Sequence, residues 1–108
     1  KIKLENYINE DRLIFLDITA DWCVTCQVNK QLVLERKPVL QSFAKANVTL
    51  LRADWTRPND MIADYLLNYD RFGIPFNSLY LPNMAEPVIF SEILAAEKII
   101  NLLENRLR

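Results

Sequence analysis

A near-continuous apolar run at residues 13–19 decides which class of fold is open to this chain. A strand of this composition suits burial on both faces, as in parallel sheets that helices cover on each side. A second run of similar character occupies residues 48–54. Helical patterns lie between the two runs, at residues 23–36 and 39–46, and Pro38 ends or kinks the first of them. The sequence therefore predicts an α/β fold.

The remaining segments complete a mixed sheet. Further helices are expected at residues 4–10, 60–69 and 95–107, and further strands at residues 76–81 and 88–90. The last two strands form a hairpin, whereas strands separated by helices imply right-handed parallel crossovers. We expect a central four-stranded mixed sheet with helices on both faces and an N-terminal helix.

Composition excludes several classes of function. The 108 residues suit a single domain, residues 1–108, and the absence of histidine excludes Ser-His-Asp triads, Cys-His pairs and histidine-bound metals. The net charge of −1 creates no strong field toward nucleic acid or anionic lipid.

No apolar run approaches the ~20 residues of a membrane helix, so we expect no membrane insertion of this segment. The start of the chain lacks both an initiating Met and a signal peptide. We therefore interpret the chain as a processed form or an excised domain.

The two cysteines of the chain, Cys23 and Cys26, form a C-x-x-C pair at the start of a predicted helix, just after a buried strand. In redox chemistry the first sulfur acts as a thiolate, and the second attacks the mixed disulfide formed on the first. Unpaired N–H groups at a helix start stabilise such a thiolate. Two alternatives stay open at this point. The cysteines could be small buried hydrophobic residues, or they could hold a soft metal such as Cu(I) during metal transfer.

The segment from Asp17 to Cys26 resembles the active-site segment of the thioredoxin superfamily. Within that superfamily, residues 20–26 are most similar to the C-terminal periplasmic domain of the DsbD family, including its ScsB-like relatives. Residues 52–56, followed by Asn59 and Asp60, resemble the second strand and following loop of that group. Residues 72–75 resemble the segment that holds the cis-proline of the thioredoxin fold.

The resemblance implies a role for each matching residue. Cys23 would be the exposed nucleophile and Cys26 the buried resolving thiol. Pro75 would be the cis-proline beside the cysteines, and the Ile74 backbone would pair with an incoming peptide. Trp22 would flank the nucleophile at the surface. The alternatives are that Pro75 is a trans proline that starts a strand and that Trp22 belongs to the core.

Phe76 stands where many thioredoxin-like proteins have Thr, which suggests an apolar rim that contacts partners. A core position on the strand is the alternative for this residue. Another departure lies after the second cysteine, where DsbD-like domains often carry a basic residue and then acids within the next helical turn. Here Gln27 is neutral and Lys30 is basic.

Asp17 lies inside the first apolar run, six residues before Cys23. Burying a carboxylate without a partner is costly, so this side chain must face a polar group. Its position matches the buried acid of thioredoxin-like domains, which exchanges a proton with the resolving cysteine. Burial should raise the pKa of Asp17. The alternative is an acid at the exposed end of the strand.

The resemblance implies a thiol–disulfide oxidoreductase, specifically a protein-disulfide reductase that relays electrons in the periplasm as a soluble domain of an inner-membrane protein. Its donor would be the transmembrane domain of the same polypeptide, and its acceptors the N-terminal domain or periplasmic redox proteins. The Cys23–Cys26 couple would be the redox centre, without a cofactor. Two alternatives stay open, a redox-inactive peptide-binding module and a disulfide isomerase. An isomerase usually needs a dimer or an extended cleft, whereas we expect a monomer because no dimerisation segment is visible.

Overall fold

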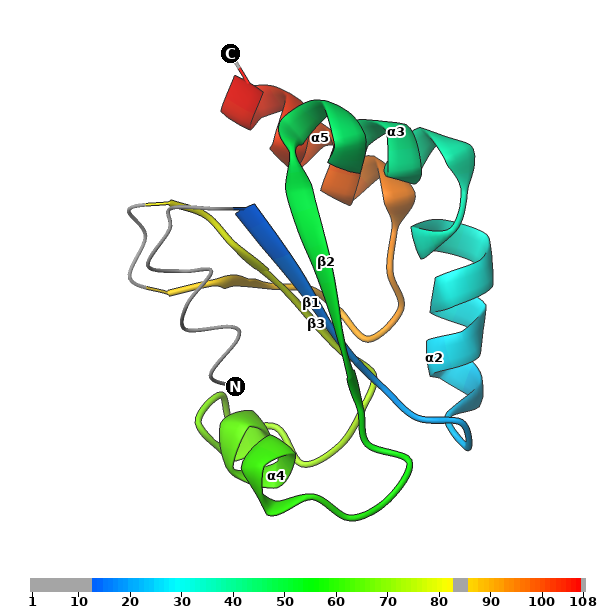
Figure 1. The fold of residues 1–108 in the computed structure, drawn as a ribbon, viewed down its shortest axis with the longest axis vertical. Helices are drawn as coiled ribbons and strands as arrows, with labels where there is room; N and C mark the ends of the chain where they lie inside the picture. The colour runs from blue at the N-terminus through cyan, green and yellow to red at the C-terminus, as the bar shows by residue number, and fades with distance from the viewer. Residues whose placement is uncertain (1–12, 83–85, 108) are drawn as a thin grey trace.

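The computed structural model describes residues 13–82 and 86–107. The helix predicted at residues 4–10 lies outside these residues. A four-stranded sheet in the order β2-β1-β3-β4 forms the centre of the molecule (Figure 1). β2 runs parallel to β1, whereas β3 is antiparallel to β1 and β4 is antiparallel to β3. The strands are β1 Leu13–Thr19, β2 Val48–Asp54, β3 Phe76–Tyr80 and β4 Val88–Ile89. The predicted mixed sheet and the bounds of the first two strands are confirmed.

The prediction of parallel crossovers is correct for β1 and β2 but wrong for β2 and β3. The connecting helix α4, Asp60–Leu67, has eight residues and is therefore about 12 Å long. A seven-residue strand is about 23 Å long, so this helix does not carry the chain back along the sheet. β3 consequently starts at the end where β1 finishes, with Phe76 opposite Ile18, and runs in the opposite direction.

The helical segment after the cysteines is divided in two. α2, Val24–Asn29, continues into a π-helical turn, η1, at Lys30–Leu34. The next helix, α3, spans Lys37–Ala46 and has Pro38 in its first turn, where a missing N–H costs little. The last helix, α5, spans Ala96–Leu107.

Different helices cover the two faces of the sheet (Figure 1). Side chains alternate between the faces along β1. Phe15 packs in a core cluster with residues of η1, α3 and α5. Ile14, Leu16 and Ile18 pack in a second cluster with Leu66 of α4. Since Asp17 has the same parity as Phe15, it faces the layer that contains α2 and η1.

Candidate active site

The two cysteines lie at the start of α2 and are joined by a disulfide, with their Cα atoms 5.2 Å apart. Cys23 is the N-cap residue of α2 and has an extended backbone. The Cys26 backbone N–H donates to Cys23 Sγ over 3.2 Å. The motif predicts that such an N–H stabilises a thiolate on Cys23 in the reduced protein, because an N–H donor favours the charged form of a sulfur.

Both cysteines are largely covered by the protein. Cys23 is 6% exposed and Cys26 is 3% exposed. The burial expected of Cys26 is observed, whereas Cys23 in the disulfide form is far less open than an exposed nucleophile would be. The cover over Cys23 includes the partly buried Ile74, which packs against Ala20 and the two cysteines.

The loop that leads from β1 to Cys23 is attached to the loop that follows β2. Thr56 accepts two hydrogen bonds from this loop, through its Oγ1 from the Asp21 N–H (2.9 Å) and through its carbonyl oxygen from Trp22 Nε1 (3.1 Å). Gln27 of α2 donates to the carbonyl oxygen of Ala20 over 3.1 Å. Trp22 is nevertheless 60% exposed, which agrees with a surface position and not with a core position.

The Ile74–Pro75 peptide bond is cis, as the sequence motif predicts. Pro75 is buried, and Ile74 contacts the cysteine cluster from the segment that precedes β3. Phe76 does not form an apolar rim beside the cysteines. Its ring is 1% exposed and packs in the α4-side core cluster, since the first position of β3 points to that face. The core alternative is therefore correct for Phe76.

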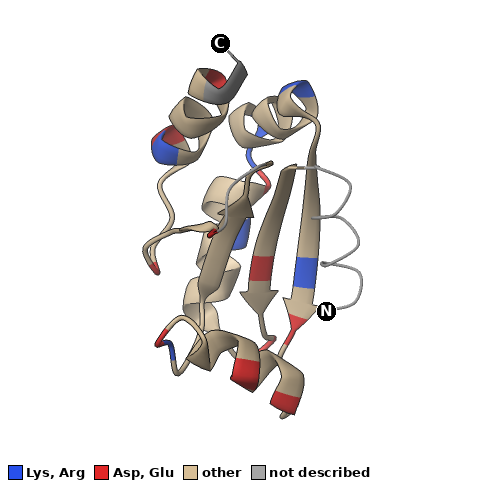
Figure 2. Cartoon of the chain, turned by 90° about the vertical axis from the view of Figure 1, so that its left-hand side faces the viewer, with Lys and Arg blue, Asp and Glu red and all other residues tan. Residues whose placement is uncertain are grey.

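Asp17 is buried, with 5% of its surface exposed, and its carboxylate lies beside a cation. Arg52 Nε lies 3.4 Å from Asp17 Oδ2. The acidic band on β1 lies beside the basic band on β2 in Figure 2. Burial raises the pKa of Asp17 above its ordinary value of 3.8, and the charges of Arg52 and Lys30 oppose this rise. Asp17 is therefore a buried acid with a raised pKa, as the sequence predicts, and not an exposed strand end.

Three polar residues near this site were not identified from the sequence. Arg52 belongs to β2, Asn77 to β3 and Asn29 to the end of α2, and both asparagines are buried. Asn29 joins α2 to the segment before α5, because its Nδ2 donates to the Glu92 carbonyl oxygen and its Oδ1 accepts from the Leu94 N–H. Arg52 and Asn77 could have been identified as candidates because each is a polar side chain within a largely apolar predicted strand.

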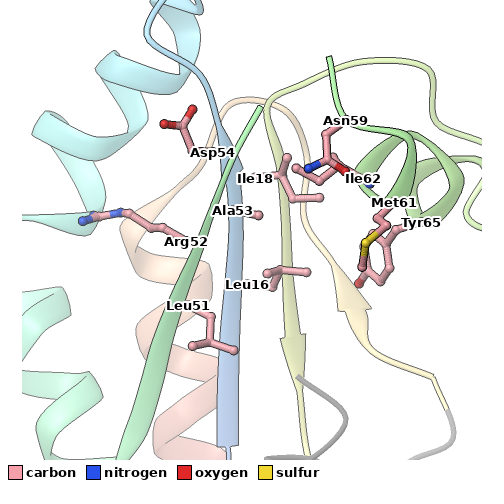
Figure 3. A pocket seen from close by; sticks show the side chains of 10 residues that line it. All are labelled: Leu16, Ile18, Leu51, Arg52, Ala53, Asp54, Asn59, Met61, Ile62 and Tyr65. Atoms are coloured by element: carbon pink, nitrogen blue, oxygen red, sulfur yellow. Dashed lines mark hydrogen bonds between the residues drawn. The ribbon is translucent and has the colours of Figure 1, made fainter. Parts of the chain in front are cut away.

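A cavity of about 340 Å³ lies on the other face of the sheet, between the first two strands and α4 (Figure 3). Its lining is mostly apolar, and Tyr65 and Met61 point into it from α4. Figure 3 shows Arg52 and Asp54 extending to the other side of β2. Asp17 occupies that same face, because it is the partner of Arg52 in the pairing of β1 and β2. The cavity is thus separated from the cysteine site by the sheet.

The site has the composition of a dithiol redox centre. Within residues 13–82 and 86–107, no group of three or more His, Cys, Asp or Glu side chains is placed to hold a metal ion. No helix in these same ranges has the length and apolar character that crossing a membrane requires. The site contains the Cys23–Cys26 disulfide of a C-x-x-C pair, which supports thiol–disulfide oxidoreductase chemistry.

Several solved structures resemble this chain. The oxidised C-terminal domain of Neisseria meningitidis DsbD is 21% identical, with a TM-score of 0.72 over 96% of this chain and 93% of that domain. The reduced form of that domain gives 20% identity and a TM-score of 0.68, over 96% and 94%. A thioredoxin from Thermus thermophilus is 17% identical, with a TM-score of 0.69 over 96% and 80%. No curated protein sequence matches the chain.

These similarities show a shared fold. A family model described as thioredoxin-like matches residues 3–82, which include both cysteines, the cis-proline and the first three strands of the sheet. The chain therefore belongs to the thioredoxin-like family.

Proposed function

We propose that this chain is a protein-disulfide reductase that relays electrons in the periplasm, as a single soluble domain of a longer inner-membrane protein. The observation that carries the proposal is the Cys23–Cys26 disulfide at the start of α2, with Ile74 packed against it and Asp17 buried on the same face of the sheet. The structural similarity to the C-terminal domain of DsbD supports the periplasmic setting.

The proposed reaction is a two-electron exchange. In the reduced protein, the Cys23 thiolate attacks a partner disulfide, forms a mixed disulfide and releases one partner thiolate. Cys26 then loses its proton and attacks the Cys23 sulfur. The second partner thiolate leaves, and both partner thiolates gain protons from the site or from water. The partner is reduced by two electrons, and the protein is left with the Cys23–Cys26 disulfide that an upstream dithiol donor reduces again.

Asp17 is proposed as the proton acceptor for Cys26. Cys26 and Lys30 are four residues apart on the helical segment and so lie on one side of it. The Lys30 charge acts on Asp17. Asp17 faces the layer that contains α2, and Cys26 is buried in that helix, which supports this pairing. A carboxyl whose pKa is raised by burial holds a proton more readily than an exposed one, which suits transient uptake of the thiol proton.

Partner proteins are proposed to bind where the cysteines approach the surface. Trp22 and Val24 flank Cys23 in sequence and are 60% and 76% exposed, which leaves apolar surface on both sides of the nucleophile. Ile74 lies on the remaining side, where its backbone could pair with an extended segment of the partner. The partners proposed are protein disulfides of periplasmic redox proteins and of other domains of the same polypeptide, with a transmembrane dithiol domain as the donor.

Trapping of the mixed disulfide tests the proposal. Cys26→Ala should accumulate covalent complexes through Cys23 with disulfide substrates, and dithiothreitol should dissolve them. The wild-type protein should catalyse insulin reduction, and Cys23→Ser should abolish this activity. A peptide-binding module with structural cysteines would bind substrates equally well in wild-type and Cys23→Ser forms without reducing them. That result, or a Cys23 that resists alkylation in the reduced native protein, would reject the oxidoreductase role.

A further inference from the structure

Asn77 of β3 is a buried amide without hydrogen-bond partners. Its side chain is among the most completely buried in the described residues, with 1% of the residue exposed. Within the described part of the chain, neither its Oδ1 nor its Nδ2 has a partner. An unpaired buried amide is costly to keep, and such a group calls for an explanation, for example a redox or catalytic role. Asn77 is therefore unlike the buried Asn29, whose amide atoms both have backbone partners.

The strand register places Asn77 opposite Asp17. The two residues are Cα partners in the antiparallel pairing of β1 and β3, and directly opposed side chains share one face, with Cβ atoms about 4.5–5.5 Å apart. Neighbours on β3 confirm the face, because Leu79 packs with Phe15 whereas Phe76 packs with α4. The Asn77 amide thus lies on the same side as the carboxyl of Asp17.

Charged and titratable groups approach Asp17 from the other elements as well. Arg52 reaches it from β2, and Lys30 acts on it from η1. Cys26 lies on the inner side of α2, and the exposed Asp54 is two residues beyond Arg52 on β2. Arg52 contacts Oδ2 at 3.4 Å, which is long for a charge-assisted hydrogen bond. Within the described residues this is the one hydrogen bond given to the carboxylate, which can accept several more.

We propose that Asn77 is a positioning residue for proton transfer, whose side-chain amide donates a hydrogen bond to the ionised Asp17 carboxylate in the reduced protein. This inference rests on the proposed function, because it gives Asp17 its role as the base for Cys26. The proton moves from Cys26 Sγ to an Asp17 carboxylate oxygen, and the resulting thiolate then attacks Cys23. By favouring ionised Asp17 before the transfer, Asn77 keeps the base available at lower pH.

The test compares the wild-type protein with Asn77→Leu, which keeps the shape of the side chain but cannot donate. The Asp17 carboxyl is titrated by NMR in the reduced protein, together with the pH dependence of thiol alkylation. We expect Asn77→Leu to raise the Asp17 midpoint by about one pH unit, the size of one hydrogen bond to a charged group. The matched control is Ser78→Ala, because Ser78 is equally buried on β3 but faces α4. It should leave the midpoint unchanged.

Two further measurements complete the test. In the wild-type protein, the resonances of the Asn77 side-chain amide should shift with pH at the Asp17 midpoint. In Asp17→Asn this pH dependence should disappear. This measurement needs no substitution at Asn77. In an Asp17→Asn background, Asn77→Leu should cause no additional change in the alkylation profile. An Asp17 midpoint that is equal in the wild-type and Asn77→Leu proteins, or amide resonances that ignore the titration, would overturn the inference. Insulin reduction by the wild-type protein reports separately on the proposed function.

Discussion

Arg52 and Asp17 occupy paired positions on the parallel strands β2 and β1, and the Arg52 guanidinium approaches the Asp17 carboxylate from a more exposed position. The Arg52 side chain is 36% exposed and the Asp17 side chain 7%. Burial and the neighbouring cation therefore act on the same carboxyl in opposite directions. Burial is the larger effect, so the pKa of Asp17 lies above its ordinary value. The balance between the two effects can be changed by substitution.

Removing the cation should move the Asp17 titration further upward. Arg52→Gln eliminates the larger of the two attractive charges and should raise the pKa of Asp17 more than Lys30→Gln does, since the influence of Lys30 is the weaker. NMR titration of the Asp17 carboxyl in the oxidised protein measures both shifts. Lys45→Gln, a change of equal charge on the exposed side of α3, serves as the control. Equal shifts for all three variants would show that only net charge matters.

The raised pKa of Asp17 also predicts how stability depends on pH. Between the ordinary value of 3.8 and the higher folded pKa, the folded protein binds a proton that the unfolded chain has lost. The free energy of unfolding contributed by Asp17 therefore falls as pH rises through this interval. Asp17→Asn should remove this fall and gain stability relative to the wild-type protein above about pH 4. Urea unfolding of the oxidised proteins at pH 4 and pH 8 measures the difference.

The control for this prediction is Asp64→Asn on the exposed side of α4, which makes the same chemical change outside the core. Its stability should keep the pH dependence of the wild-type protein. If the free energy of unfolding changes equally between pH 4 and pH 8 in Asp17→Asn and in the wild-type protein, ionisation of Asp17 does not destabilise the fold.

Local sequence signals were sufficient for the strands and the cysteine motif. The β1 and β2 bounds follow from apolar runs that stop at charged or small residues, and the C-x-x-C pair needs only the helix start beside it. Helix ends were less accurate because caps determine them. α4, for example, begins at Asp60 as predicted, after Asn59, whose Oδ1 accepts from the Ile62 N–H over 3.1 Å, but it ends at Leu67, two residues before the predicted end.

Properties that depend on contacts between strands could not be predicted from local patterns. The direction of β3 depends on how far the connection through α4 carries the chain. The rule that strands separated by a helix run parallel does not take the length of that connection into account. Arg52 and Asn77 gain their place beside Asp17 through the register of three strands. Phe76 was ambiguous because its exposure depends on which face of β3 it occupies. A single sequence does not show how the strands are paired, so it does not show which side chains from different strands lie beside one another.

Asn29 should be important for the stability of the helix that carries the cysteines. Its Nδ2 donates to the Glu92 carbonyl oxygen over 2.8 Å, and its Oδ1 accepts from the Leu94 N–H over 3.1 Å. Asn29→Ala leaves both backbone groups without these partners and should lower the free energy of unfolding by roughly 2–4 kcal/mol. Chemical denaturation measures the loss, and Asn101→Ala on the exposed side of α5 is the matched control. A loss below that of the control would show that water replaces the amide.

Thr56 should fix the loop in front of the cysteines. Its Oγ1 accepts from the Asp21 N–H and donates to Asp54 Oδ1, and its backbone N–H also donates to Asp54 Oδ1, over 2.9 Å. The two bonds to Asp54, the hydroxyl bond first, hold the pKa of Asp54 below its ordinary value. Thr56→Val keeps the shape of the side chain and its backbone carbonyl, so the Trp22 contact remains available while both hydroxyl contacts are lost. Loss of the Asp21 bond should cost about 1 kcal/mol of stability. The pKa of Asp54 should rise toward its ordinary value.

The lowered pKa of Asp54 means that its contribution to stability is present above the ordinary value of 3.8 and is lost as pH falls through the lower folded pKa. Thr56→Val should therefore lose the part of its stability difference from the wild-type protein that depends on ionised Asp54 under strongly acidic conditions, whereas the part due to the Asp21 bond should remain. Thr49→Val, the same substitution at a half-buried position on β2, is the control and should leave the Asp54 titration in place. Because Asp21 precedes Trp22 and Cys23, Thr56→Val should also slow insulin reduction mainly through a higher KM. An unchanged KM together with an unchanged Asp54 titration would show that this loop is held by the Trp22 contact alone.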